Sequence, residues 1–382
     1  MIAPNYIPTL DPNPLPAPYW VFKLLLLVTF FLHILAMNFM LGGAVLALVA
    51  RRAKNREQGN RMFADIAKKL PSLLPATITI GIAPLLFLQV LYGQFFYTSS
   101  VIVAWPWFLV LICLTLAYYG FYYTSFKGSQ YPDKAKTVMS FSLILVFIIG
   151  FIYSNNLTLS QTPSRWAEKY FADPGGWNLN WSEPTLIPRF LHFFVAAVAM
   201  GGLLLVFIAL AKWNRDREYA RGHLQLGGKA FMFATMAQFL IGIWFLATLP
   251  KELRMLFLGD SAVATILLMV GLVGGGASIF LMSAALQKEN VRFAAYSVSS
   301  IIGVVILSMS IMRDMLRDAY LKPYYHPDQF VVRTQWTVFP LFLGLFIAGV
   351  ILWLVMLKRY FSNAKSGKEM AAEAPALVGA AK

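Results

Sequence analysis

Histidine can bind a metal ion or transfer protons. The chain has four histidines: His33, His192, His223 and His326. His33 and His192 fall inside apolar stretches long enough to cross a membrane. Because a polar side chain in hydrocarbon is costly, an intramembrane histidine predicts a functional role, with a hydrogen bond between helices as the alternative. His223 is expected in a basic, solvated loop and His326 in a loop on the other side. His33 and His192 are therefore the candidate metal ligands.

Both candidate histidines are predicted near the same membrane face. His33 precedes Arg51 by 18 residues, which is about 27 Å of helix, and His192 follows the start of its predicted span by a few residues. Met269 is predicted at nearly the same depth as His192. Imidazole and thioether together form a standard axial pair for haem iron, whereas a methionine in an apolar helix is ordinarily a packing residue. Spacing alone leaves both interpretations of Met269 open.

Composition indicates that lipid is the solvent of this chain. It has 382 residues, of which 59% are hydrophobic and 13% charged, which is more apolar surface than one soluble core can hide. A bilayer core of about 30 Å needs roughly 20 apolar residues per helix. We therefore predict an all-α polytopic membrane protein, with a transmembrane domain over 1–361 and a flexible cytoplasmic tail over 362–382. Nine spans are predicted, at 19–50, 70–98, 101–125, 137–155, 187–211, 228–250, 261–286, 294–312 and 334–357.

The net charge of +15 is a topology signal. The loops on one side carry 22 Lys and Arg against 8 Asp and Glu, and those on the other carry 10 against 9. The positive-inside rule then predicts a bacterial inner-membrane protein with a periplasmic N-terminus and a cytoplasmic C-terminus. Lipid is an expected partner and nucleic acid is not. The single cysteine, Cys113, excludes a disulfide or a CxxCH attachment of c-type haem within this chain.

Three segments resemble the large subunit, subunit I, of cytochrome bd quinol oxidases. Residues 150–202, with GFIYSNNLTLSQTPSRW and PTLIPRFLHFFVAAVAMGG, are similar to the family's helix 4, outer loop and helix 5. FFLHILAMNFMLGG at 30–43 resembles its first helix, and LLMVGLVGG at 267–275 a later one. The resemblance implies that His192 and Met269 are axial ligands of a low-spin haem b and that His33 ligates a high-spin haem. One to three haems b are expected, with a variant haem as an alternative at His33.

The sequence also departs from this family in ways that bear on function. Gln89, in LLFLQVLYGQ, stands where the family has a membrane acid, and no Asp or Glu is predicted deep in any span. The family's GRQPW motif is missing, and its long quinol-binding loop is replaced by the short stretch 250–261. Leu267 replaces an arginine beside the ligand methionine. These departures disfavour oxygen reduction and quinol oxidation by the family's route, and leave Gln89 as a cofactor-contacting candidate.

Arginines on the predicted outer side are candidate partners for haem propionates, which they bind by paired hydrogen bonds. These are Arg189, Arg313 and Arg317, with Arg254 as a fourth. The alternative is that they pair with nearby carboxylates such as Asp314, Asp318 and Glu252. The aromatic-rich outer loops 156–186 and 313–333 either cover a cofactor or dock a partner, or else form an interfacial aromatic belt.

The sequence therefore predicts a membrane b-type cytochrome subunit that transfers electrons through haem near the periplasmic face, within a respiratory complex. Its expected partners are a second membrane subunit, a periplasmic c-type cytochrome, or both, together with quinone. One alternative is a terminal oxidase subunit that reduces oxygen. Another is a haem-free membrane scaffold or transporter subunit that has kept the fold.

Overall fold

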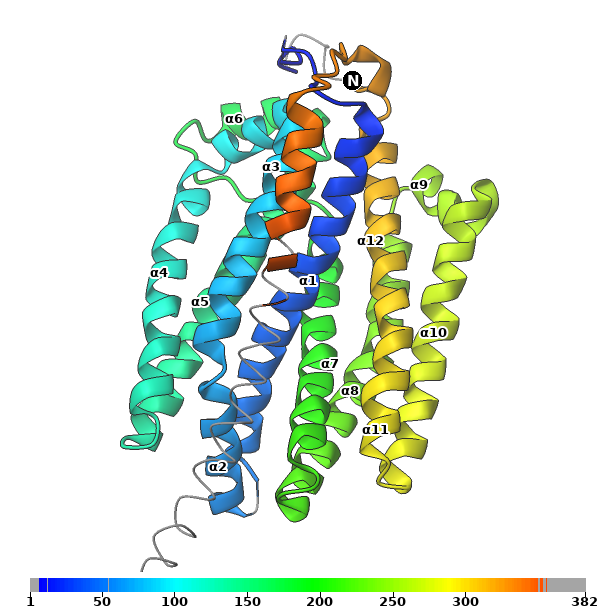
Figure 1. Cartoon of the computed structure of the whole chain (residues 1–382). Helices are drawn as coiled ribbons and strands as arrows, with labels where there is room; N and C mark the ends of the chain where they lie inside the picture. Colours follow the sequence, from blue (N-terminus) through cyan, green and yellow to red (C-terminus); the bar gives the residue numbers. More distant parts are fainter. Residues whose placement is uncertain (1–6, 12, 54, 350, 353–354, 356–382) are drawn as a thin grey trace, which may run out of the picture. The chain divides into compact units, whose positions relative to one another are not determined.

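The computed structural model describes residues 7–11, 13–53, 55–349, 351–352 and 355. These residues are mostly helical (Figure 1), and beyond one isolated bridge they contain no β-structure. Eight stretches of the described residues are long and apolar enough to cross a membrane, which confirms the predicted all-α polytopic class. The helices are α1 (Tyr19–Ala50), α2 (Arg56–Ala67), α3 (Leu70–Ile102), α4 (Ala104–Lys127), α5 (Pro132–Ser160), α6 (Trp166–Ala172), α7 (Leu186–Lys212), α8 (Arg217–Thr248), α9 (Lys251–Met255), α10 (Ala262–Gln287), α11 (Val291–Phe293) and α12 (Ser299–Leu321).

The chain divides into two compact units. In the smaller unit, residues 13–21 associate with residues 330–349. Leu15 N donates to Val331 O at 2.8 Å, and Arg333 N donates to Leu15 O at 3.0 Å. The predicted ninth span, 334–357, includes the apolar helix Val338–Gly349, but 350, 353–354 and 356–357 lie outside the described residues. So does the whole predicted tail, 362–382.

Short polar segments separate the helices of the larger unit, and several supply caps. Asn55 Oδ1 accepts from Gln58 N at 3.1 Å before α2, and Asp216 Oδ1 accepts from Tyr219 N at 3.2 Å before α8. Pro132 is the first residue of α5, where its missing N–H has no cost. These caps satisfy N–H groups that have no partner within the helix.

The larger unit contains one arrangement of helices twice. His192 follows His33 by 159 residues (192 − 33 = 159), and the segments 31–43 and 190–202 both begin with Phe-Leu-His and end with Gly-Gly. The same offset moves α4 to 263–286, where α10 spans Ala262–Gln287, and moves α5 to 291–319, where α11 and α12 span 291–321. It moves α2 and α3 together to 215–261, where α8 and α9 lie. The element order thus indicates an internal duplication, with α1 and α7 as equivalent first helices.

The two first helices cross at their glycines. A β-carbon on Gly42 would lie 1.7 Å from Ala197 O, and one on Gly201 would lie 2.3 Å from Gly42 C. Gly202 meets Gly227 of α8 in the same way, since a β-carbon on either would lie 2.5 Å from the carbonyl oxygen of the other. Glycine is therefore required at these positions, because only a residue without a side chain lets two helix backbones approach so closely.

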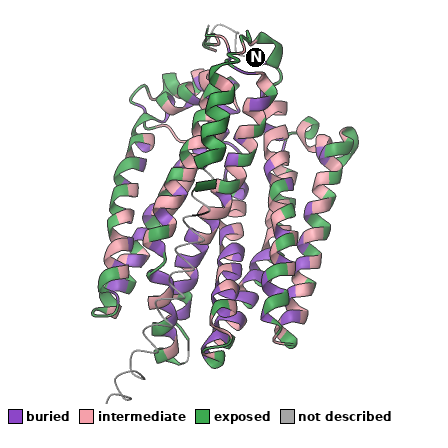
Figure 2. Ribbon diagram, in the orientation of Figure 1, coloured by how far each residue is buried: buried purple, intermediate pink, exposed green. Residues whose placement is uncertain are grey.

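Packing differs between the two ends of the larger unit, which we call the α2 end and the α6 end after the helices found there (Figure 1). Two apolar cores occupy the α2 end, one around Phe63 and Phe121 and the other around Phe231 and Met282. Figure 2 shows buried residues concentrated toward this end of the central helices. A smaller apolar core lies at the α6 end around Leu249 and Phe257.

Two predicted boundaries were wrong, and both change the surroundings of charged or titratable residues. α12 continues to Leu321 rather than ending at 312, so Arg313, Asp314 and Arg317 belong to a long helix and not to a loop. α8 begins at Arg217 rather than 228, so His223 is helical and fully buried instead of solvated. Charged residues lower the mean hydropathy of a segment without interrupting its helix, which is why hydropathy placed both boundaries too early.

We expect Gly42→Ala to destabilise the protein by about 1–3 kcal/mol, because the new methyl group overlaps the α7 backbone. Alanine ordinarily stabilises a helix relative to glycine by about 1 kcal/mol. The expected change in stability therefore has the opposite sign to the change in helix propensity. Thermal unfolding of the detergent-solubilised chain measures the difference. Gly276→Ala is the control, since its β-carbon would meet nothing within 4 Å. Equal unfolding temperatures for the two variants would contradict the close contact.

Candidate functional site

His33 lies on α1 and faces α3. Its Nδ1 is 3.1 Å from the backbone oxygen of Thr77, and a β-carbon at Gly81 would lie 2.7 Å from both Nδ1 and Cε1 of the ring. When Nδ1 carries the proton it donates to this carbonyl, and the lone pair of Nε2 is then available to a metal. Thr77 and Gly81 therefore orient the ring in the manner of a metal-ligating histidine.

His192 occupies the equivalent position on α7 and faces α8. A β-carbon at Gly242 would lie 3.6 Å from its Cε1, and Gln238 Nε2 donates to its backbone oxygen at 2.7 Å. Its Nδ1 is buried and has no hydrogen-bond partner. A buried polar atom without a partner costs free energy, so this imidazole calls for an explanation beyond helix packing.

Two helix stretches around His192 contain no fully buried residue. None of residues 190–196 of α7 and none of residues 236–248 of α8 is buried; we call these two stretches the open layer. The α8 stretch covers more than three helical turns, so it includes every face of the helix and not only a lipid-facing one. Several side chains of the open layer still pack against the neighbouring cores, among them Phe194, Val195, Phe245 and Leu246. The open layer is therefore a half-buried part of the bundle, less deeply buried than the cores at the α2 end.

Two of the candidate arginines lie near the histidines without a carboxylate partner. Arg189 is buried, donates from Nη1 to Gln161 Oε1 at 3.0 Å, and has an Nε without a partner. Arg313 lies over the ring of Phe30, 4.2 Å from guanidinium carbon to ring centre, within electrostatic range of His33, Arg189 and Arg317. No carboxylate in the described part of the chain pairs with Arg313. This cluster of positive charge is suited to bind an anion.

Arg317 has a different environment, and for it the alternative prediction of a carboxylate partner is confirmed. It pairs with Asp314, whose other oxygen is 2.5 Å from Lys23 Nζ. Lys23 also binds Asp318 at 2.7 Å and the hydroxyl of Tyr92 at 2.9 Å. Arg317 Nε has no partner. The result is a network of compensated charges on α1, α3 and α12, next to the uncompensated Arg313.

The structure does not bring Met269 to His192. Met269 is 46% exposed, on the same stripe of α10 as the exposed Ile266 and Val273, and α10 packs against α8 and α12 rather than α7. Its ligand role stays a prediction. Met309 of α12 points at α10 instead, with its terminal carbon 2.2 Å from where a β-carbon of Gly271 would be.

The remaining candidates are placed as follows. Gln89 is half-buried on α3, two turns beyond Gly81, and its role stays a prediction. His326 is exposed near η5 (Pro327–Gln329). Buried His223 has its Nδ1 3.2 Å from Tyr219 O and an Nε2 without a partner. No group of three or more His, Cys, Asp or Glu that could hold a metal occurs among the described residues, so the histidines are candidates as individual axial ligands.

Sequence reasoning missed the participation of Lys23 and Tyr92 in the charged network, and with it the ion pair at Asp314. A signal was present, because Lys23 stands alone among apolar residues at the start of α1. A charged residue in such a place requires a partner. Its carboxylate partners lie almost 300 residues away in sequence, on a helix that was predicted to end before them, so only the folded chain identifies them.

Comparison with known protein families finds no family model that matches this chain. Comparison with curated proteins finds no significant match either.

We expect Asp314→Asn to destabilise the protein by roughly 3–5 kcal/mol, because it leaves the buried Arg317 without a carboxylate and Lys23 with Asp318 alone. Asp260→Asn, at an exposed carboxylate, should change stability by less than about 0.5 kcal/mol. Thermal unfolding in one detergent compares the two. If both variants unfold at the wild-type temperature, the network does not stabilise the fold.

Proposed function

We propose that the chain is a haem-binding electron-transfer subunit of a membrane-bound redox complex, with His192 and His33 as haem ligands. One observation carries the proposal: His192 lies in the open layer of α7 and α8, and its Nδ1 atom is buried without a hydrogen-bond partner. The duplicated position of His33 and the unpaired Arg313 beside it add support. Together they match the family resemblance of the three sequence segments.

The residues present fit a haem in two respects. The Nδ1 atom of His192 is buried without a partner, and the helix stretches around this histidine are only half-buried. Arg189 and Arg313 could bind its carboxylates. Met269, as it lies, does not complete an axial pair.

A haem bound here would supply one-electron redox chemistry. The chain would provide the ligands, their orientation and the surrounding charge. Thr77 O holds the tautomer of His33 that presents Nε2, and the arginines place positive charge beside the carboxylates. Since Arg313 has no counter-charge in the described residues, it should also favour the state of the site that carries the additional electron.

The predicted topology would put this site near the periplasmic face, with the N-terminus outside. The α2 end, with its basic loops, would then be cytoplasmic. We propose that electrons pass to or from a second membrane subunit, a periplasmic c-type cytochrome or quinone. The exposed aromatic residues Trp177 and Trp181 near the α6 end, 57% and 63% exposed, are available for such contacts.

A terminal oxidase remains the second candidate. It is favoured by Asp314 and Asp318, which the structure places within α12 rather than in a loop, because carboxylates in membrane helices commonly relay protons. Oxygen consumption separates the two functions. The electron-transfer subunit should show none by itself, whereas an oxidase should consume oxygen with a supplied reductant and lose this activity in Asp314→Asn protein that still folds.

We expect the purified protein to show a b-type band in its reduced-minus-oxidised spectrum. His192→Ala and His33→Ala should each lower the haem-to-protein ratio by about one haem or convert that haem's signal, because each removes one ligand. His223→Ala, at a buried histidine away from the site, and His326→Ala, at an exposed one, are the matched controls. A wild-type spectrum without any b-type band would favour the haem-free scaffold.

We expect Arg313→Gln to lower the midpoint potential of the haem nearest to His33. Removing a positive charge near the site disfavours the reduced state, which carries one more electron. Redox titration of the purified protein measures the shift, and Lys251→Gln, which changes an exposed lysine at the start of α9, is the control. An unchanged potential in Arg313→Gln protein with full haem content would place Arg313 away from the redox site.

A further inference from the structure

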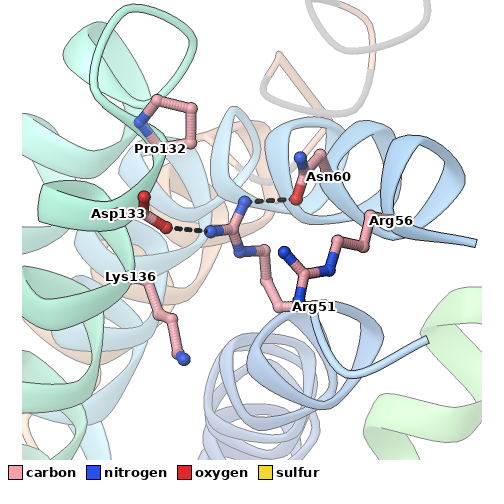
Figure 3. Close-up of a pocket in the computed structure, with 6 residues that line it drawn as sticks. All are labelled: Arg51, Arg56, Asn60, Pro132, Asp133 and Lys136. Carbon is pink, nitrogen blue, oxygen red and sulfur yellow. Dashed lines mark hydrogen bonds and ion pairs between the residues drawn. The ribbon is translucent and has the colours of Figure 1, made fainter. Parts of the chain in front are cut away.

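A pocket at the α2 end is lined by cationic side chains that the proposed function does not use. It has a volume of about 370 Å³ and lies where α1 ends, α2 begins and α5 begins. Figure 3 shows Arg51 extending between Asn60 and Asp133, with Arg56 beside it. The lining residues are Arg51, Arg56, Asn60, Pro132, Asp133 and Lys136.

Arg51 is held in a fixed position at the base of this pocket. Its Nη2 is 2.7 Å from Asp133 Oδ1, its Nη1 donates to Asn60 Oδ1, and its guanidinium lies over the ring of Phe63 at 5.7 Å. Its side chain is only 9% exposed. Because the protein already holds this arginine in one position, a ligand that binds to it avoids the entropic cost of ordering the side chain.

Arg56 and Lys136 contribute positive charge that the protein does not neutralise. Both are exposed, and no carboxylate in the described residues pairs with either. The pocket therefore has three cationic side chains and one carboxylate, Asp133. The N-terminal ends of α2 and α5, which begin at Arg56 and Pro132, add the positive ends of two helix dipoles. This combination favours a phosphate-bearing anion.

The surface next to the pocket indicates which phosphate-bearing anion it is. Further along α5 from the pocket, Phe141, Ile144 and Ile148 form an exposed apolar stripe, at 53%, 55% and 40% exposure. Their spacing of three and four residues places them on one face of the helix. A free phosphate ion would make no favourable contact with an apolar stripe, whereas the acyl chains of a lipid would cover it.

We infer that the pocket binds the headgroup of an anionic phospholipid, whose acyl chains lie along this face of α5. Arg51 gives the phosphate a preoriented donor, and Arg56 and Lys136 add charge at the rim. The inference does not depend on haem binding at the α6 end. It assigns the α2 end a specific lipid site in addition to general attraction by its basic loops.

Native mass spectrometry of the full chain in detergent, titrated with phosphatidylglycerol, tests the proposal. We expect one tightly bound lipid, and a roughly 30-fold weaker affinity in the double variant Arg56→Gln with Lys136→Gln, because two charges near the membrane surface are lost. The double variant Lys288→Gln with Arg292→Gln is the control. It removes two exposed charges near the junction of α10 and α11 and should bind as the wild type does.

Phosphatidylcholine and inorganic phosphate complete the test. Weaker binding of phosphatidylcholine than of phosphatidylglycerol supports an anionic headgroup, and equal binding overturns it. Inorganic phosphate that displaces phosphatidylglycerol at comparable concentration would show a free-phosphate site and overturn the lipid proposal. Equal losses in the two double variants would show that only total basic charge matters. All variants change exposed side chains, and a single size-exclusion peak confirms that each is folded.

Discussion

The contact between the backbones of α1 and α7 at Gly42 and Gly201 is the constraint on which the rest of the larger unit depends. Each histidine precedes its glycine by nine residues, about 13 Å along the helix. Fixing the two glycines against each other therefore also puts His33 and His192 at one level, on equivalent sides of the crossing. Duplication of a sequence segment becomes, through this contact, duplication of a site.

The two ends of the larger unit differ in how their helices are held together. Apolar cores at the α2 end hold the helices together around Phe63, Phe121 and Phe231. The α6 end has a smaller apolar core around Leu249 and Phe257, and ion pairs of Asp314 with Lys23 and Arg317 connect α1 to α12 there. Around His192 the helices are only half-buried.

Each end combines paired and unpaired cations. At the α6 end Lys23 and Arg317 pair with carboxylates, whereas Arg313 has no carboxylate partner among the described residues. At the α2 end Arg51 is neutralised while Arg56 and Lys136 remain available at the surface. In both places one buried, oriented arginine is accompanied by uncompensated charge, an arrangement that selects anions because binding them needs little reorganisation.

The sequence by itself determined the class of structure and the two candidate histidines. Long apolar runs can only be membrane helices, and a histidine inside one is costly wherever the helix packs, so both conclusions depend on local composition alone. Tertiary structure decided the rest: the partners of Arg317, the exposure of Met269, the burial of His223 and the open layer around His192. These features depend on which helices become neighbours and on where each helix ends. Contacts between residues far apart in sequence determine which helices are neighbours, and no single segment of the sequence contains that information.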